Sequence, residues 1–187
     1  MNSKSLLEVE KLDVRYQTKD GEIHAVADVS FKVFPNEVFG IAGESGCGKS
    51  TLIKGIMRLL PENAKMDVRS IKYKDQEIDC MRENIFREEV LWTQISLVPQ
   101  SAMNSLNPVY KVGEQIVEAI QTHTSQGKKE ARERVEELFD VVGLQSEFMD
   151  SFPHEFSGGM RQRAMIAMAL ALDPGLIVMD EPTTGLD

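Results

Sequence analysis

Residues 43 to 50 read GESGCGKS and follow the apolar run VFGIA at 38 to 42. The segment matches the pattern G-x-x-x-x-G-K-[ST], in which successive backbone N–H groups surround a phosphate, a lysine reaches the outer phosphates and a hydroxyl binds Mg²⁺. We therefore predict a nucleotide site with Lys49 as the cation and Ser50 as a metal ligand. The predicted contacts to the nucleotide come from Gly43, Ser45, Gly46, Cys47, Gly48, Lys49, Ser50 and Thr51.

The flanking pattern supplies the setting that this loop requires. VFGIA predicts a buried strand, and Ser50 to Leu60 predicts a helix that Pro61 stops. A glycine-rich turn that binds nothing is the alternative, and the complete motif after a strand disfavours it. Cys47 admits two interpretations, a redox-active thiol at a helix N-terminus or a small loop side chain, and we favour the second.

A second set of polar residues ends another apolar run, LIVMDEP at 176 to 182. A carboxylate at the end of a buried strand is a natural partner for an ATP-bound Mg²⁺, so Asp180 is predicted as a metal ligand. Glu181 is predicted to orient and deprotonate the attacking water. The alternative, a strand merely capped by acidic residues, is disfavoured because Lys49 and its loop supply the context for a shared site.

Composition limits the classes of partner. The chain has 187 residues, 42% of them hydrophobic, and a formal net charge of -9, which disfavours nonspecific attraction to nucleic acid or anionic membranes. No apolar run approaches the roughly 20 residues that span a bilayer, and the start MNSKSLLEVE lacks an apolar signal core. Two cysteines, Cys47 and Cys80, form neither a metal spacing nor a disulfide framework. We expect a soluble, non-exported protein in a reducing compartment.

Periodicity predicts the remaining elements. Leu12, Val14 and Tyr16 alternate with polar residues, as do Val29, Phe31 and Val33, and Thr18 to Glu22 forms the turn between these two strands. Further β structure is expected around Val68 to Tyr73 and at Ile95 to Val98, with a helix from Met81 to Glu89 between them. From Val112 the period becomes helical and predicts an inserted helical lobe, whose acidic outer surface is interpreted as a solvated face.

The stretch SGGMRQR at 157 to 163 lies shortly before LIVMDEP, and Gln100 follows a strand at VPQ. Ser157 caps the predicted helix Met160 to Leu172, where exposed amides can bind an anion. The ordered motifs resemble the ATPase subunits of ATP-binding-cassette (ABC) transporters over essentially the whole chain. Within that family the chain resembles most the oligopeptide, dipeptide and nickel importer group, through Cys47, Met160, NSLNPVYKVGEQI at 104 to 116 and FPHEFSGGMRQR at 152 to 163.

The resemblance implies a fold and further site residues. The fold class is α/β, a P-loop NTPase core of the ABC ATPase type with an N-terminal antiparallel β-subdomain and an inserted α-helical subdomain. Tyr16 is expected to stack on adenine, and Gln100 to touch Mg²⁺ or the attacking water. Ser157, Gly158 and Gly159 are expected to complete the γ-phosphate pocket of a partner subunit, and Asp187 matches an aspartate that follows the Mg²⁺ strand. For Tyr16, Gln100 and Ser157 the ordinary alternatives are an edge-strand tyrosine, a surface amide and a bare helix cap.

The resemblance also implies domain bounds and partners. One domain, 1–187, is expected to divide into a β-subdomain and P-loop core at 1–100, a helical subdomain at 101–157, and the signature helix with the Mg²⁺ strand at 158–187. The switch histidine of the family is expected beyond Asp187, since His24, His123 and His154 lie too early, so this stretch alone should bind nucleotide but hydrolyse it poorly. Expected partners are a homologous or identical ATPase subunit in a head-to-tail dimer, membrane permease subunits and, indirectly, an extracytoplasmic solute-binding protein, at the inner face of the cell membrane.

Three functions therefore stand as hypotheses. The first is the ATP-hydrolysing subunit of a solute importer, with ATP and Mg²⁺ as cofactors. The second is a nontransport ABC protein on ribosomes or DNA, which the single acidic cassette without basic patches disfavours. The third is a nucleotide-binding module without effective hydrolysis. Comparing turnover with binding separates the first from the third.

Overall fold

The computed structural model describes residues 4–100 and 105–181. The chain forms two compact units, Met1–Phe86 and Arg87–Asp187. The strand at Ile95–Val98 belongs to the second unit, where it pairs with the strand at Leu176–Met179. Each unit is described on its own below.

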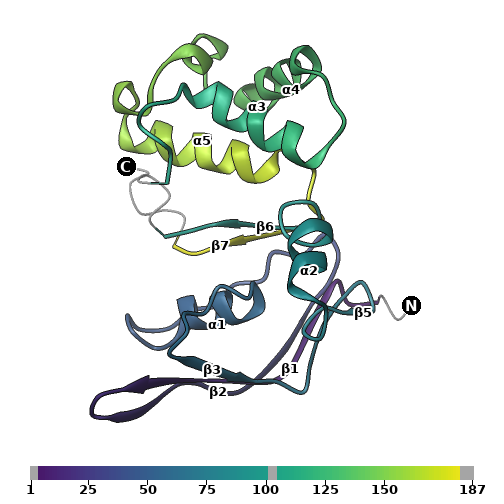
Figure 1. Ribbon diagram of the computed structural model, residues 1–187, viewed down its shortest axis with the longest axis vertical. Helices are drawn as coiled ribbons and strands as arrows, with labels where there is room; N and C mark the ends of the chain where they lie inside the picture. The colour runs from purple at the N-terminus through teal and green to yellow at the C-terminus, as the bar shows by residue number, and fades with distance from the viewer. Residues whose placement is uncertain (1–3, 101–104, 182–187) are drawn as a thin grey trace. The chain divides into compact units, whose positions relative to one another are not determined.

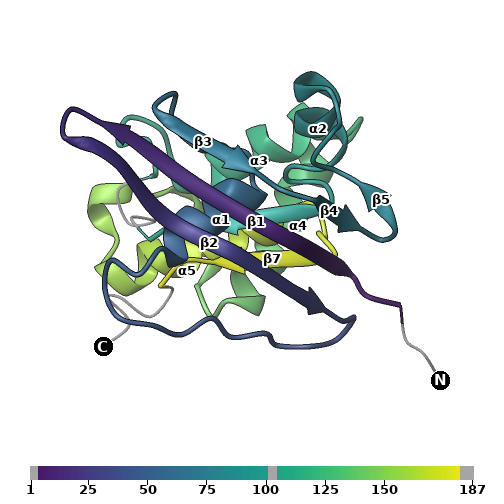
Figure 2. The same cartoon turned by 90° about the horizontal axis from the view of Figure 1, so that it is seen from below.

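An antiparallel sheet forms most of the first unit. Its strands are β1 (Leu7–Thr18), β2 (Gly21–Val33), β3 (Ala64–Asp67), β4 (Ser70–Tyr73) and β5 (Gln76–Glu77). β1 pairs with β2 along one edge and with β4 and then β3 along the other, as Figure 2 shows. The predicted hairpin is confirmed: Thr18 faces Gly21 across the turn. The β structure expected at Val68 to Tyr73 is two strands, with Val68 in the link between them.

Helix α1 (Lys49–Ile56) packs on one face of this sheet. Leu12 and Val14 of β1 are fully buried, and their methyl groups lie within van der Waals contact of the position that a Cβ on Gly55 would occupy. A Cβ at position 55 would therefore make ordinary packing contacts with the sheet. The alternating apolar residues of β1 thus form the surface against which α1 packs.

The predicted helix bounds were wrong at the C-terminus of α1, which ends at Ile56 and not at Leu60. Arg58 adopts a left-handed conformation with φ 54°. Its guanidinium donates to the carbonyls of Met81, at 2.7 Å, and Ile78, and lies 4.5 Å from the centre of the Phe86 ring. These contacts turn the chain before Pro61 can act as the helix stop.

The prediction of a strand at VFGIA was also wrong, because residues 38–42 have no strand conformation. Val38 is fully exposed, and Phe39 and Ile41 are 41% and 42% exposed. A β-strand requires a neighbouring strand whose backbone forms hydrogen bonds with its N–H and C=O groups. No described strand pairs with this segment. Phe39 instead stacks on Phe31 of β2, with ring centres 5.1 Å apart.

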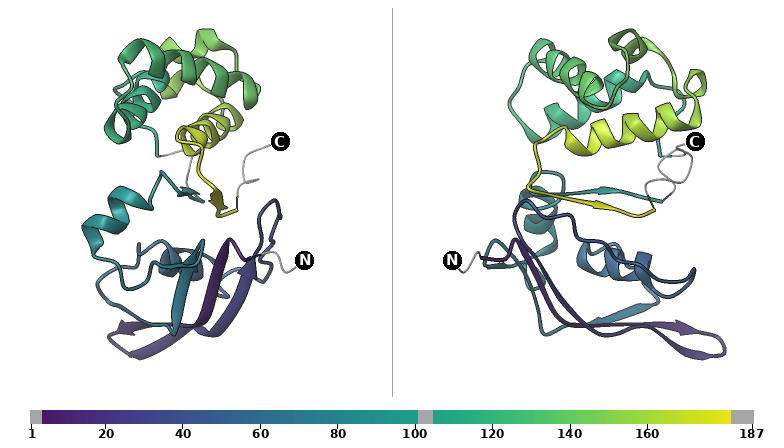
Figure 3. Two further views of the ribbon diagram at one scale, coloured as in Figure 1. Left: turned by 90° about the vertical axis from the view of Figure 1, so that its right-hand side faces the viewer. Right: turned by 180° about the vertical axis from the view of Figure 1, so that it is seen from behind.

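The second unit combines two parallel strands with a helical core. β6 (Ile95–Val98) and β7 (Leu176–Met179) were both predicted as strands from their apolar runs, and the structure pairs them in parallel. Figures 1 and 3 show α5 running beside these strands and α3 and α4 packed beyond it. The helices are α3 (Val112–His123), α4 (Lys128–Val141) and α5 (Gly158–Leu170), with 3-10 turns at Ser146–Asp150 and Pro153–Glu155; α2 (Glu83–Glu89) links the two units. Among the described residues, no helix has the length and apolar character to cross a membrane.

Close packing explains the composition of the helical core. A Cβ on Gly113 of α3 would lie 2.8 Å from Met149, so only glycine permits this contact. Leu138 and Phe139 of α4 are buried, and α5 faces them with small residues such as Ala164 and Ala167. Polar bonds tie the same helices at the surface: Asp150 accepts from Arg132 at 2.6 Å and from Lys111 at 3.4 Å.

Candidate functional site

The phosphate loop lies in the first unit and leads directly into α1. Gly46 and Gly48 have φ values of 83° and 97°, which L-residues with a Cβ rarely adopt. A Cβ on Gly48 would also clash with the Ala25 carbonyl of β2, and one on Gly43 would lie 2.5 Å from Cys47 Sγ. These three glycines therefore allow the loop to turn tightly against its neighbours, as the motif predicts.

Lys49 lies over this loop. Its Nζ donates to the carbonyl oxygens of Gly43, at 2.8 Å, and Glu44, at 2.9 Å. An ammonium group has three donors, so the same nitrogen can offer a further N–H to an anion. With the amides at the start of an eight-residue helix, the loop has the donor set that a phosphate requires.

Two neighbouring side chains complete the description of the loop. The exposed Cys47 Sγ lies 3.8 Å from Lys49 Nζ. Tyr16, near the end of β1, shares a hydrogen bond of 3.3 Å between its hydroxyl and Thr51 Oγ1 of α1. The phenol therefore lies beside the helix that the phosphate loop begins. Its stacking on adenine remains a prediction, as do the individual roles of all the site residues below.

In the second unit the sequence places polar residues after both parallel strands. Gln100 follows β6, and Asp180 and Glu181 follow β7. Because neighbouring parallel strands end at the same edge, these side chains meet: Gln100 Nε2 donates to Glu181 Oε2 at 2.6 Å. Two residues predicted separately as catalytic are thus in direct contact.

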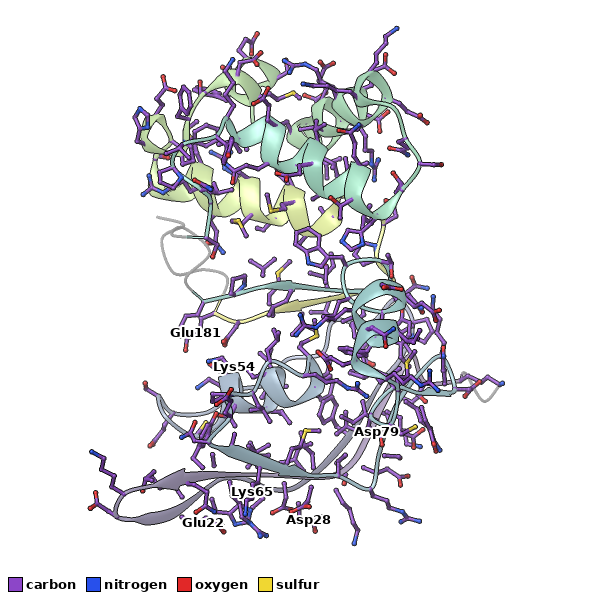
Figure 4. All side chains as sticks on the ribbon, viewed as in Figure 1. Glu22, Asp28, Lys54, Lys65, Asp79 and Glu181 are labelled. Atoms are coloured by element: carbon purple, nitrogen blue, oxygen red, sulfur yellow. The ribbon has the colours of Figure 1, made fainter. Side chains whose placement is uncertain are left out.

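The two carboxylates differ in exposure. Asp180 is 8% exposed, and its backbone N–H donates to the Val98 carbonyl at 3.0 Å, which continues the β6–β7 ladder. Glu181 is exposed and has a φ of 50°, a left-handed conformation uncommon for this residue type. Figure 4 shows Glu181 at the end of β7. The buried aspartate is therefore held in place, whereas the glutamate faces solvent with one oxygen bound by Gln100.

The third motif begins α5. Ser157 is the N-cap, and its Oγ accepts from the Met160 N–H at 3.2 Å. The predicted cap is confirmed, and Gly158 and Gly159 form the first turn. Arg161 and Arg163 donate to backbone carbonyls, Phe156 and Gly143 respectively, each at 2.7 Å. Both guanidinium groups therefore bind the protein's own backbone.

Within each unit, the donor chemistry of the predicted residues suits one part of an ATP–Mg²⁺ complex. The phosphate loop provides amides and an ammonium group, while Ser50 and Asp180 provide the oxygen ligands that Mg²⁺ prefers. No group of three or more His, Cys, Asp or Glu side chains within 4–100 and 105–181 forms a cluster of the kind that binds metals by protein ligands alone.

The sequence matches the ABC transporter family over residues 26–184. The chain belongs to this family. The Bacillus subtilis dipeptide transport ATP-binding protein DppD is 41% identical over 185 residues, which cover 97% of this chain and 55% of that protein. The Salmonella typhimurium oligopeptide transport ATP-binding protein OppD is 44% identical over 187 residues, covering 97% of this chain and 54% of that protein. The chain spans about half the length of these curated relatives.

Solved ABC structures share the fold. A dimeric post-hydrolysis state of the ATP-binding cassette MJ0796, bound to ADP and Pi, is 25% identical with a TM-score of 0.86, covering 97% of this chain and 76% of that one. The CbiO1 protein of Clostridium perfringens, part of the transporter complex CbiONQ, is 30% identical with a TM-score of 0.77, covering 98% and 68%. The expected α/β ABC ATPase fold is therefore confirmed.

Two features escaped sequence reasoning. The first is the left-handed backbone of Glu181, which its residue type does not indicate. Its contact with Gln100 could have been suggested by the polar residues that follow two neighbouring parallel strands. The contact between Ala25 and Gly48 depends on an irregularity of β2 that no periodicity reveals. The predicted Asp187 lies outside the described residues.

Proposed function

We propose that the protein is the ATP-binding and ATP-hydrolysing subunit of an ABC importer for peptides or related small solutes. The observation that carries this proposal is the 2.6 Å bond between Gln100 and Glu181 at the ends of two parallel strands. It places an amide where it can orient a carboxylate without adding charge. The peptide class rests on the dipeptide and oligopeptide transport names of the curated relatives.

Binding is assigned to the first unit. Loop amides and Lys49 would hold the phosphates, and Tyr16 would stack on the adenine ring. The helix N-terminus adds a favourable partial positive charge. Ser50 would supply a hydroxyl ligand for Mg²⁺, and the bound metal would neutralise charge that develops during transfer.

Hydrolysis is assigned to the second unit. Glu181 accepts a proton from water, and Gln100 keeps the carboxylate oriented for this step. Asp180, held by the β6–β7 ladder, supplies a carboxylate toward the metal. Phosphoryl transfer is catalysed mainly by positioning and charge stabilisation, so these side chains have to be held and not merely present.

The same reading assigns partners. Ser157, Gly158 and Gly159 would contact the γ-phosphate held by a second ATPase subunit in a head-to-tail dimer, and permease subunits would dock near Gln100 and the loop after it. A hollow of about 970 Å³ in the second unit supports this docking position, because Ser105, Asn107 and Tyr110, which follow Gln100 along the chain, help to line it. The protein would then work at the inner face of the cell membrane, with an extracytoplasmic solute-binding protein as an indirect partner.

Replacing Glu181 by glutamine in the full-length subunit tests the proposed chemistry. The amide keeps the shape of the side chain but accepts a proton poorly, so the steady-state rate of phosphate release should fall by about 100-fold or more. Affinity for ATP should stay within about twofold of the wild type, because the residues that bind the phosphates are unchanged. Phosphate release and equilibrium binding of a fluorescent ATP analogue measure the two quantities.

Glu137→Gln on the exposed face of α4 is the matched control, and it should leave both quantities unchanged. Undiminished turnover in Glu181→Gln would remove Glu181 from the role of base. Binding without turnover in the wild type would favour the nucleotide-binding module over the ATPase.

A further inference from the structure

Strand β2 is irregular where it passes the phosphate loop. Val14 of β1 pairs with Val26, and the next residue, Arg15, pairs with His24, so the register skips Ala25. Leu12 pairs with Val29, so Asp13 alone faces the two residues 27 and 28. β2 therefore carries two extra residues within a short distance, which is the definition of successive β-bulges.

The first bulge points a carbonyl at the phosphate loop. A Cβ on Gly48 would collide with the Ala25 oxygen and would lie 3.5 Å from Val26 Cγ2. Gly48 is the N-cap of α1 and has a φ of 97°. The backbone of Ala25 therefore forms the surface on which the left-handed turn into α1 rests. Bulges near functional sites commonly redirect backbone groups in this way.

One carboxylate fixes both bulges from the opposite face of the sheet. Asp13 Oδ2 accepts the backbone N–H of Asp28 at 2.9 Å, and Oδ1 pairs with His24 Nε2. An ionised carboxylate can only accept, so the proton of this pair lies on the histidine. The two bonds flank Ala25 along β2. Figure 4 shows Asp28 and Glu22 on the sheet face turned away from α1.

The surrounding charges leave Asp13 ionised. Arg15 Nη2 lies 3.4 Å from Asp13 and its Nε lies 3.8 Å from Glu22, while β3 places Asp67 opposite Asp13 and Lys65 opposite Arg15. The Asp28 N–H, assisted by His24 and Arg15, lowers the pKa of Asp13 from its ordinary value despite partial desolvation. The carboxylate can therefore hold the bulge throughout the neutral range.

We propose that Asp13 is a positioning residue for the phosphate loop. By holding Asp28 and His24 on either side of Ala25, it fixes the carbonyl on which Gly48 rests and so preorganises the loop for nucleotide. The proposal depends on the proposed function only in that the loop binds nucleotide. It assigns a role in affinity to a residue that lies on the far face of the sheet from α1.

Equilibrium binding of a fluorescent ATP analogue with Mg²⁺ tests this role. Asp13→Ala should weaken affinity by roughly three- to tenfold, the range of coupling through a packed backbone contact. Asp13→Asn should bind within about twofold of the wild type, because its amide oxygen can still accept the Asp28 N–H. Asp13→Thr should behave like alanine while favouring the strand, because its hydroxyl is too short to reach. Glu22→Ala, on the same hairpin but without a bond to the bulges, is the matched control and should bind like the wild type.

The outcomes separate the two claims. A wild-type protein that fails to bind ATP would refute the proposed function. A wild type that binds, with Asp13→Ala and Asp13→Thr both matching its affinity, would overturn the positioning role even if their thermal stability fell. Should alanine prevent folding, the comparison of threonine with asparagine decides the matter, since equal affinity of these two variants would contradict the proposal.

Discussion

At the scale of single residues, Gly46 and Gly48 show two different reasons for glycine in the phosphate loop, a positive φ and a close contact with a neighbouring backbone. Both have positive φ, but a Cβ on Gly46 would meet nothing within 4 Å whereas one on Gly48 would meet the Ala25 carbonyl. The glycine spacing was predicted from the sequence. The close contact of Gly48 with the Ala25 carbonyl was not predicted, because it comes from a bulge in a strand more than twenty residues away along the chain.

Alanine at each position should therefore cost different amounts of stability. Gly46→Ala should lower the free energy of unfolding by about 1 to 2 kcal/mol, the cost of a left-handed L-residue. Gly48→Ala adds a backbone collision and should cost about 3 kcal/mol or more, or prevent folding. Urea unfolding followed by circular dichroism measures both. Equal losses for the two variants would show that the Ala25 carbonyl gives way freely.

At the scale of elements, Asp150 links the N-terminus of α3 to α4. The Arg132 guanidinium, followed by the Lys111 ammonium, lowers the pKa of Asp150 below its ordinary value. A carboxyl group with a depressed pKa in the folded state stabilises the fold fully above its unfolded pKa of about 4. This contribution disappears as pH falls through the lower folded value.

Asp150→Asn should consequently lower the free energy of unfolding at pH 7 by only about 0.5 kcal/mol, because the side chain is 53% exposed and the ion pairs are screened. The difference between the variant and the wild type should shrink as pH falls from 5 to about 2. Chemical unfolding across this pH range provides the measurement. A constant difference between Asp150→Asn and wild type would contradict the pKa assignment.

Element prediction succeeded where local pattern decides and failed where distant contacts decide. Alternation in β1 and helical periodicity in α3 and α4 sufficed because burial follows them directly. α1 ended early because Arg58 reaches the carbonyls of Ile78 and Met81, and VFGIA is not a strand because no described strand pairs with it. Both failures depend on tertiary partners that a window of sequence does not contain.

At the scale of the whole molecule, the three motifs sort into two compact units. The phosphate loop and Tyr16 belong to Met1–Phe86, and Gln100, Ser157, Asp180 and Glu181 belong to Arg87–Asp187. The sequence predicted each motif and the family, since residue type and spacing carry that information. It did not predict the Gln100–Glu181 bond, because that contact depends on the pairing of β6 with β7.

The central claim is that the phosphate loop binds nucleotide through Lys49, and calorimetric titration of ATP with Mg²⁺ into wild type and Lys49→Ala tests it most directly. Removing a charge-assisted donor should weaken binding by about 10- to 100-fold without loss of folding, because the hydrogen bonds of Nζ to the Gly43 and Glu44 carbonyls and to Cys47 Sγ are all exposed. Lys54→Ala, on the exposed side of α1, is the matched control and should bind like the wild type. Equal affinity of wild type and Lys49→Ala would contradict the account.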